Sequence, residues 1–142
     1  MYEDTLSHVD LFANLDKKEL QALGRGCQER HYSAGTTILS QGDTGVGLYI
    51  IKSGKVRILH SSSPDRPDEE LATAGAGDVI GEMSLLDDLP RSASVIAVDD
   101  VTALLLPIWE FRTTLQSHPD IALKLLSVLS RRLRKAENRS HE

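Results

Sequence analysis

The chain has 142 residues, a formal net charge of −5 and a composition that is 40% hydrophobic, 26% charged and 4% aromatic. This length suits one compact domain with its own core, and the acidic balance argues against a protein whose main partner is DNA or an anionic membrane. The scarcity of aromatic residues also argues against a stacking platform for single-stranded nucleic acid.

The sequence also indicates a cellular setting. Its single cysteine, Cys27, cannot form an internal disulfide, which suits a reducing compartment. Residues 1–10 lack the basic and apolar regions of a signal peptide, and the longest apolar run, around residues 101–109, is too short to span a bilayer. We therefore predict a cytoplasmic protein without a membrane segment.

The N-terminal part of the chain predicts short helices. Residues 5–12 place apolar side chains at helical spacing. A second helix should begin at Asp16, whose carboxylate can cap it while Glu19 reaches back in a capping box. Gly24 and Gly26 then end this helix.

Residues 27–106 have a different sequence pattern, in which short apolar runs are broken by turn residues every few positions. Many short strands with Gly and Asp turns predict a mainly β fold, an antiparallel β-roll or jelly roll of about eight strands. Within it, the apolar run 49–51 followed by Ser53-Gly54-Lys55 predicts a β-hairpin. The candidate strands are Gln28–Tyr32, Thr36–Ser40, Leu48–Lys52, Val56–His60, Glu70–Ala74, Ser92–Val98 and Ala103–Leu106.

The stretch 81–95, GEMSLLDDLPRSASV, carries the most distinctive set of polar groups in the sequence. Arg91 can present a planar fork to phosphate oxygens. Glu82 only accepts hydrogen bonds when ionised, so it suits a hydroxyl donor rather than the phosphate. Backbone N–H groups around residues 83–84 and Ala93 can complete an anion-binding nest. The set predicts a small ligand that carries both a phosphate and a sugar hydroxyl.

After Leu106 the sequence predicts helices again. Pro107 suits a first helical turn, and residues 109–115 fit one short helix. A break at 118–120 precedes a long helix that runs from Pro119 to about Asn138. This helix carries a heptad seam, formed by Ala122, Leu126, Leu129, Leu133 and Ala136, and a second apolar stripe, formed by Ile121, Leu125 and Val128. The pattern fits two separate faces, one of them for a partner helix, and it fits one broad core-facing stripe equally well.

The stretch 81–95 resembles the phosphate-binding cassette of cyclic-nucleotide-binding domains, which runs Gly-Glu-hydrophobic-small-Leu, a variable turn, then Pro-Arg-Ser/Thr/Ala-Ala-x-Val. Upstream, Gln41-Gly42-Asp43, the run 48–51, Gly54 and Val56 resemble the first half of the same family. The resemblance implies a cyclic purine nucleotide as regulatory ligand, with Ser at position 92 favouring cAMP over cGMP. It places the phosphate at Arg91, Ser92, Ala93, Ser84 and Met83, the ribose at Glu82 and Gly81, and the base near Leu71 and Ala74.

The last helix resembles the central helix of the catabolite-activator family through Pro119-Asp120-Ile121 and Arg131-Arg132-Leu133. This resemblance implies a homodimer through Leu126, Leu129 and Leu133, or an effector protein in that place, and a base-side or interdomain contact by Arg132. Two departures stand out. Ala136 and Glu137 occupy positions where those activators carry hydroxyl residues that reach the base, and the sequence offers no helix-turn-helix. We therefore expect no direct DNA binding.

These observations predict one domain over residues 1–142, with helices at 1–26 and 107–142 and the β-roll at 27–106. We expect a regulatory module without catalytic residues, cofactor or metal. One alternative is a protein-interaction module of the same fold that no longer binds nucleotide; the Glu82/Arg91 pair argues against it, and Ala136 with Glu137 argues for it. The other alternative is an enzyme on a cupin-like roll, which the scattered histidines disfavour.

Overall fold

The computed structural model of the protein describes residues 1–44, 46–82, 85–87 and 89–140. The chain divides into two compact units, a helical unit (Met1–Gly26 with Trp109–Glu142) and a β unit (Cys27–Ile108). The prediction of a single domain over the whole chain stays a prediction. Among the described helices, none is both long and apolar enough to cross a membrane.

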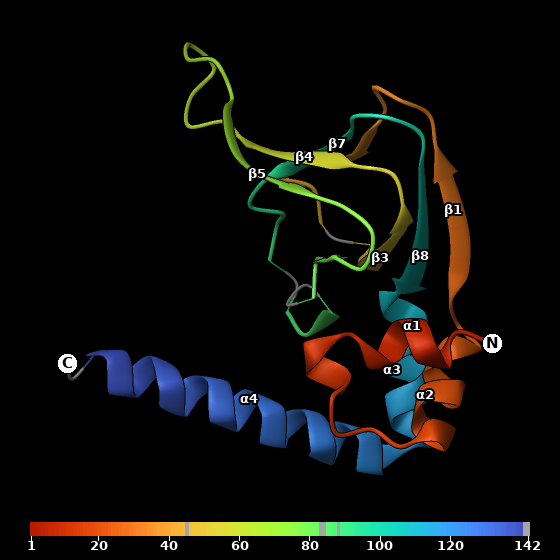
Figure 1. The fold of residues 1–142 in the computed structure, drawn as a ribbon. Coiled ribbons are helices and arrows are strands. Elements are labelled where there is room, and N and C mark those ends of the chain that lie inside the picture. The colour runs from red at the N-terminus through yellow and green to blue at the C-terminus, as the bar shows by residue number, and fades with distance from the viewer. Residues whose placement is uncertain (45, 83–84, 88, 141–142) are drawn as a thin grey trace. The chain divides into compact units, whose positions relative to one another are not determined.

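The β unit consists of two antiparallel four-stranded sheets, one in the order β1-β8-β3-β6 and the other in the order β2-β7-β4-β5 (Figure 1). This architecture confirms the predicted antiparallel β-roll. The strands are β1 (Gln28–Tyr32), β2 (Thr37–Leu39), β3 (Gly47–Ser53), β4 (Val56–His60), β5 (Glu69–Ala74), β6 (Val79–Ile80), β7 (Ser94–Ala97) and β8 (Val101–Pro107).

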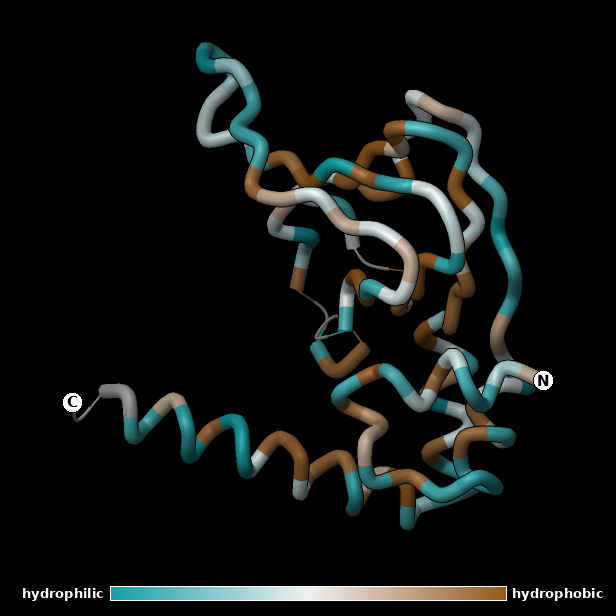
Figure 2. The backbone as a smooth tube through the Cα atoms, viewed as in Figure 1, coloured by the Kyte–Doolittle hydropathy of each residue, from teal (hydrophilic) through white to brown (hydrophobic). Residues whose placement is uncertain are grey.

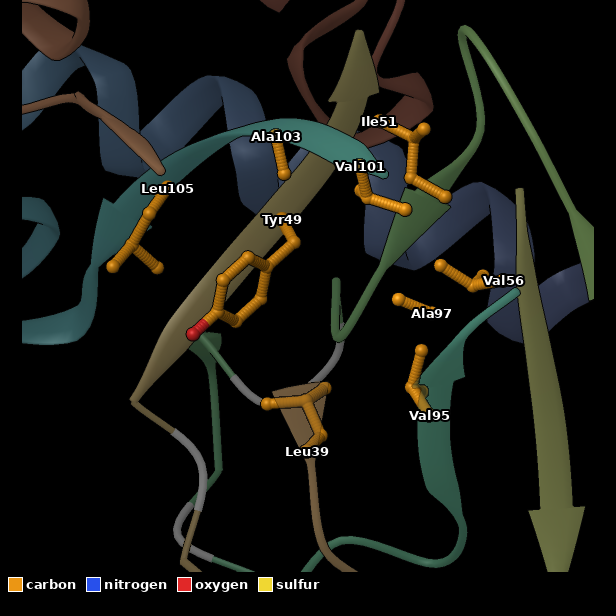
Figure 3. Packing of buried hydrophobic residues seen from close by; sticks show 9 residues of the cluster. All are labelled: Leu39, Tyr49, Ile51, Val56, Val95, Ala97, Val101, Ala103 and Leu105. Atoms are coloured by element: carbon orange, nitrogen blue, oxygen red, sulfur yellow. The ribbon is translucent and has the colours of Figure 1, made fainter. Parts of the chain in front are cut away.

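The hydrophobic core of the β unit fills the space between the two sheets. Successive side chains of a strand point to opposite faces, so every second residue of β8, from Val101 to Leu105, points into this space. Figure 3 shows them facing side chains from the opposite sheet. The buried cluster consists of Leu39, Tyr49, Ile51, Val56, Val95, Ala97, Val101, Ala103 and Leu105.

The predicted hairpin between β3 and β4 is wrong. β3 pairs with β8 and β6, whereas β4 pairs with β5 and β7, so the turn at 53–55 carries the chain from one sheet to the other. Gly54 has a φ of +94°, and a Cβ atom there would lie 2.3 Å from the carbonyl oxygen of Asp100. The backbone N–H of Lys55 donates to Asp99 Oδ1 at 2.7 Å. The turn is therefore shaped by its contact with residues 99–100 and not by pairing between its flanking strands.

Some predicted strand boundaries also differ from those in the structure. β7 begins at Ser94 rather than at Ser92, because residues 92 and 93 form a bend. Pro107 ends β8 opposite Gly47 instead of beginning a helix, and the next helix starts at Ile108. β6 has only two residues, too few for an alternating pattern to be recognised, and was not predicted.

The helical unit contains α1 (Glu3–Ser7), the 3-10 helix η1 (Asp10–Phe12), α2 (Lys17–Gly24), α3 (Ile108–Ser117) and α4 (Pro119–Ser140). The helix expected over residues 5–12 is thus split into α1 and η1. The capping box of α2 is confirmed, because Asp16 Oδ1 accepts from the backbone of Glu19 and Glu19 Oε1 accepts from the backbone of Asp16, both at 2.9 Å.

The two apolar stripes of α4 differ in burial. Ile121, Leu125 and Val128 are at most 5% exposed, whereas Leu126 and Leu133 of the heptad seam are 60% and 61% exposed. Hydrophobic and hydrophilic segments alternate along this helix in Figure 2. The structure therefore favours two separate faces over one broad core-facing stripe.

Truncating a core side chain should destabilise the protein far more than truncating an exposed side chain of the same size. Leu105 is 3% exposed and Leu71 of β5 is 54% exposed. We expect Leu105→Ala to lower the free energy of unfolding by about 2–5 kcal/mol, because the substitution removes buried methyl groups and leaves a cavity. Leu71→Ala should cost less than about 0.5 kcal/mol. Urea denaturation without ligand measures both changes, and equal losses would contradict this description of the core.

Candidate functional site

A cavity of about 440 Å³ opens in the β unit between side chains of β2, β4, β6 and β7 and residues of the segment 81–93. Its wall on the sheet side is apolar and its other side carries polar groups. The strands contribute Leu39, Ile58, Ile80 and Val95, and the segment contributes Gly81, Glu82, Asp87, Leu89, Pro90, Arg91, Ser92 and Ala93.

The apolar wall is continuous with the hydrophobic core. Leu39 and Ile58 both lie opposite Val95 in the strand register, so the three side chains form a row across β2, β7 and β4. Leu39 and Val95 are members of the buried cluster, and Ile58 packs against that cluster. Because core side chains are closely packed, this wall is a rigid surface against which a flat apolar group can lie.

Arg91 is held by both its backbone and its side chain. Its backbone N–H donates to the carbonyl oxygen of Asp43 at 2.8 Å, and its carbonyl oxygen accepts from the N–H of Gly42 at 2.9 Å. The guanidinium donates from Nη2 to the carbonyl oxygen of Gly47 at 2.6 Å, and the residue is only 7% exposed. Burial lowers the pKa of the Arg91 guanidinium, because a charge loses solvation there. Arginine stays protonated in proteins, so the cavity retains a positive charge.

Gly81 makes the position of this guanidinium sterically feasible. Its φ of +81° lies in the left-handed region that favours glycine. A Cβ atom at residue 81 would also lie 2.1 Å from Arg91 Nη1. Two independent constraints, the backbone conformation and the closeness of Arg91, therefore require glycine at this position.

The structure brings five of the ten predicted ligand residues to one cavity. Gly81, Glu82, Arg91, Ser92 and Ala93 all line it. Glu82 and Ala93 are half-buried, and Ser92 is exposed. The cavity thus offers an acceptor carboxylate and a donor guanidinium beside an apolar wall. Met83 and Ser84 lie outside the described residues, and their predicted contacts with the phosphate stay predictions.

The three predicted base-side residues are not among the described residues that line the cavity. Leu71 and Ala74 belong to β5, and neither is among the described residues that line the cavity. Leu71 falls where the register between β4 and β5 shifts, while Ala74 packs against the core cluster. Arg132 belongs to the helical unit, where its Nη2 donates to Asp10 Oδ2 at 2.5 Å. The base-side roles of these three residues stay predictions.

The apolar wall and one acidic residue, Asp87, were not predicted from the sequence as parts of the site. Val95 is part of the motif, but no contact with the ligand was predicted for it. The alternation of strand residues indicates that Leu39 and Ile58 face inward. Their convergence depends on strand pairing, which the sequence does not reveal. Within the part of the chain that the structure describes, no three His, Cys, Asp or Glu side chains group together as metal ligands would.

Comparison with known proteins shows which family the chain resembles. The model of the cyclic nucleotide-binding domain matches residues 29–118. The cyclic AMP receptor protein of Thermus thermophilus is 39% identical over 127 residues, which cover 89% of this chain and 58% of that protein. The chain therefore spans about three-fifths of the length of that relative.

Solved structures agree in fold. The N-terminal domain of a transcriptional regulator from Streptomyces coelicolor A3(2) superposes with a TM-score of 0.86 at 36% identity, covering 95% of this chain and 96% of that one. The regulatory domain of Toxoplasma gondii PKA, crystallised with cAMP, gives a TM-score of 0.75 at 26% identity, covering 95% of this chain and 49% of that one. The family match over most of the β unit, together with a relative of 39% identity, shows that the chain belongs to the cyclic nucleotide-binding domain family.

Proposed function

We propose that the protein is a non-enzymatic regulatory module that binds a cyclic purine nucleotide, with cAMP favoured over cGMP. The observation that carries this proposal is the buried guanidinium of Arg91, which shares a cavity with the carboxylate of Glu82. A cavity of about 440 Å³ is large enough for a small ligand of this class.

The charges of the cavity determine how such a ligand must lie. A carboxylate repels a phosphate, so Glu82 is compatible with the ligand only if a hydroxyl group faces it and the phosphate faces Arg91. A cyclic nucleotide carries its 2′-hydroxyl and its cyclic phosphate at a fixed separation on one ribose. The row formed by Leu39, Val95 and Ile58 can then contact the apolar parts of the sugar and base.

The preference for cAMP rests on two supports. Ser92 lines the cavity. In the family that the stretch 81–95 resembles, threonine at this position favours guanine, so serine favours cAMP. In addition, the relative from Thermus thermophilus is named a cyclic AMP receptor protein, and the Toxoplasma gondii domain was crystallised with cAMP. We extend that ligand to this chain as part of the proposal.

The proposal has a competitor in a protein-interaction module of the same fold that does not bind nucleotide. The observation in its favour is that Ala136 and Glu137, both exposed on α4, replace the hydroxyl residues that reach the base in similar activators. A folded, ligand-free protein that gives no heat with either nucleotide would favour this competitor.

Removing the guanidinium should abolish most of the nucleotide affinity. We expect cAMP to bind with micromolar affinity, and Arg91→Ala to weaken binding by about 2–5 kcal/mol, because the phosphate then lacks its charge-assisted partner. The cAMP affinity of Arg91→Lys should lie between those of the unmodified protein and Arg91→Ala, since lysine keeps the charge without the planar fork. Calorimetric titration with cAMP and cGMP measures these affinities.

Arg57 provides a matched control for this series. It lies on β4, is exposed, and pairs with Glu70 at 2.6 Å, away from the described lining of the cavity. Arg57→Ala should therefore bind cAMP like the unmodified protein. Thermal unfolding must first show that each variant is folded. Unchanged cAMP affinity in folded Arg91→Ala would refute the proposed phosphate site.

The role of Glu82 can be tested by changing the protein and the ligand together. We expect 2′-deoxy-cAMP to bind the unmodified protein more weakly than cAMP by about 1–3 kcal/mol, because a hydrogen bond to a charged acceptor is lost. In Glu82→Ala the two ligands should bind alike, since the hydroxyl no longer has its partner. Glu69→Ala, at an exposed position of β5, is the control. A 2′-hydroxyl effect of the same size in Glu82→Ala and in the unmodified protein would assign the hydroxyl to another residue.

We further propose that α4 reports occupancy of the cavity to a second copy of the chain or to an effector protein. The exposed seam residues Leu126 and Leu133 supply an apolar contact surface for that purpose. A ligand can shift the helix only if it binds one arrangement of the helix more tightly than another.

This signalling role predicts a measurable response of the helix. Saturating cAMP should change the hydrogen-exchange protection of α4, or the monomer–dimer equilibrium, or both. Exchange measured by mass spectrometry and sedimentation measured with and without cAMP give the two readings. If cAMP binds and neither reading changes, α4 does not transmit the signal.

A further inference from the structure

The described lining of the cavity contains more negative than positive side chains. Among the described residues that line it, Arg91 is the one cationic side chain, whereas Glu82 and Asp87 are both carboxylates. Asp87 is half-buried, and its Oδ1 accepts from the backbone N–H of Leu89 at 3.2 Å, which orients the carboxylate in a local turn. Arg91 and Glu82 have roles in the proposed function, whereas Asp87 has none.

We propose that Asp87 is a specificity-determining residue that disfavours ligands with a doubly charged phosphate. This inference rests on the proposed function of the cavity and specifies which phosphates it accepts. The phosphate of a cyclic nucleotide is a diester with a single negative charge. A linear nucleoside 5′-monophosphate is a monoester whose second ionisation lies near pH 6, so it carries close to two charges at neutral pH.

The repulsion by Asp87 acts on both ligands but in proportion to their charge. Arg91 attracts the phosphate in the same proportion, so the contribution of Asp87 is seen when its charge alone is removed. A second charge on the phosphate doubles the repulsion from the carboxylate of Asp87, which lines the same cavity. Two unit charges about 10 Å apart, at an effective dielectric constant of about 20, interact strongly enough to change an affinity roughly tenfold. A residue of this kind lets the protein respond to a cyclic nucleotide in the presence of linear ones.

The experiment must separate the charge of the phosphate from the closure of its ring. Three ligands do so: cAMP, 5′-AMP, and the methyl ester of 5′-AMP, which is linear like 5′-AMP but singly charged like cAMP. Calorimetric titration at neutral pH gives the three affinities for the unmodified protein, for Asp87→Asn and for Asp65→Asn. The amide oxygen introduced by Asp87→Asn can accept the same bond from Leu89, so the turn is retained. Asp65 is an exposed acid of the loop between β4 and β5 and serves as the matched control.

We call the ratio of the affinity for the methyl ester to the affinity for 5′-AMP the gap, and we expect Asp87→Asn to narrow it roughly tenfold relative to the unmodified protein. Asp65→Asn should leave the gap unchanged. If Asp87→Asn unfolds at a lower temperature, Asp87→Ser, which also keeps an oxygen acceptor, provides the same reading.

The outcomes distinguish this inference from the proposal beneath it. If cAMP binds and the gap is the same in Asp87→Asn as in the unmodified protein, the inference is wrong while the proposed function stands. A gap that narrows equally in Asp65→Asn also overturns it, because the effect then comes from the net charge of the protein. If the unmodified protein binds none of the three ligands, the proposed function fails and the inference fails with it.

Discussion

The candidate site depends on one costly feature, a guanidinium kept almost entirely away from water. Burying a charge without partners costs several kcal/mol, so a buried arginine persists only where other interactions offset that cost. Here the carbonyl oxygen of Gly47 accepts from Nη2, and the main chain of Arg91 is fixed by residues 42 and 43. Gly81 leaves the space that the guanidinium occupies. Residues 42, 43 and 47 are thus brought to Gly81 and Arg91, which lie far from them in the sequence.

The cavity lining has two parts, one from the hydrophobic core and one from a connecting segment. The apolar wall belongs to the core, since Leu39 and Val95 pack in the cluster that joins the two sheets. The polar groups come from the segment 81–93, which contains a bend, turns and an isolated bridge between Pro90 and Thr44. In the proposed function, the ligand bridges these two parts of the lining.

The sequence allowed the chemistry of the site to be predicted because that chemistry is local. Glu82 and Arg91 lie in one short stretch, and the types and order of residues around them indicate their roles. The antiparallel fold was predictable for a similar reason, since each strand has its own alternation and its own turn. The pairing of strands is not local. Ser53-Gly54-Lys55 has the composition of a hairpin turn, yet its strands join different sheets because Gly54 packs against residues 100–101. Leu39 and Ile58 meet at Val95 for the same non-local reason, and no pattern within either strand indicates that contact.

The buried charge also gives a reason to expect that binding of an anion changes the stability of the segment that holds Arg91. Desolvation lowers the pKa of Arg91, which means that the charged form is less favourable in the fold than in water. An anion placed against the guanidinium offsets part of that cost and so stabilises the folded arrangement of the segment that holds Arg91. By linkage, whatever stabilises the ligand-bound arrangement of that segment raises the affinity for the ligand by the same factor. In the proposed function, the carboxylates of Glu82 and Asp87 limit this gain to ligands that bring a single negative charge and a hydroxyl group. The desolvation of one cation and the proposed selectivity for a singly charged anion then follow from the same set of charges.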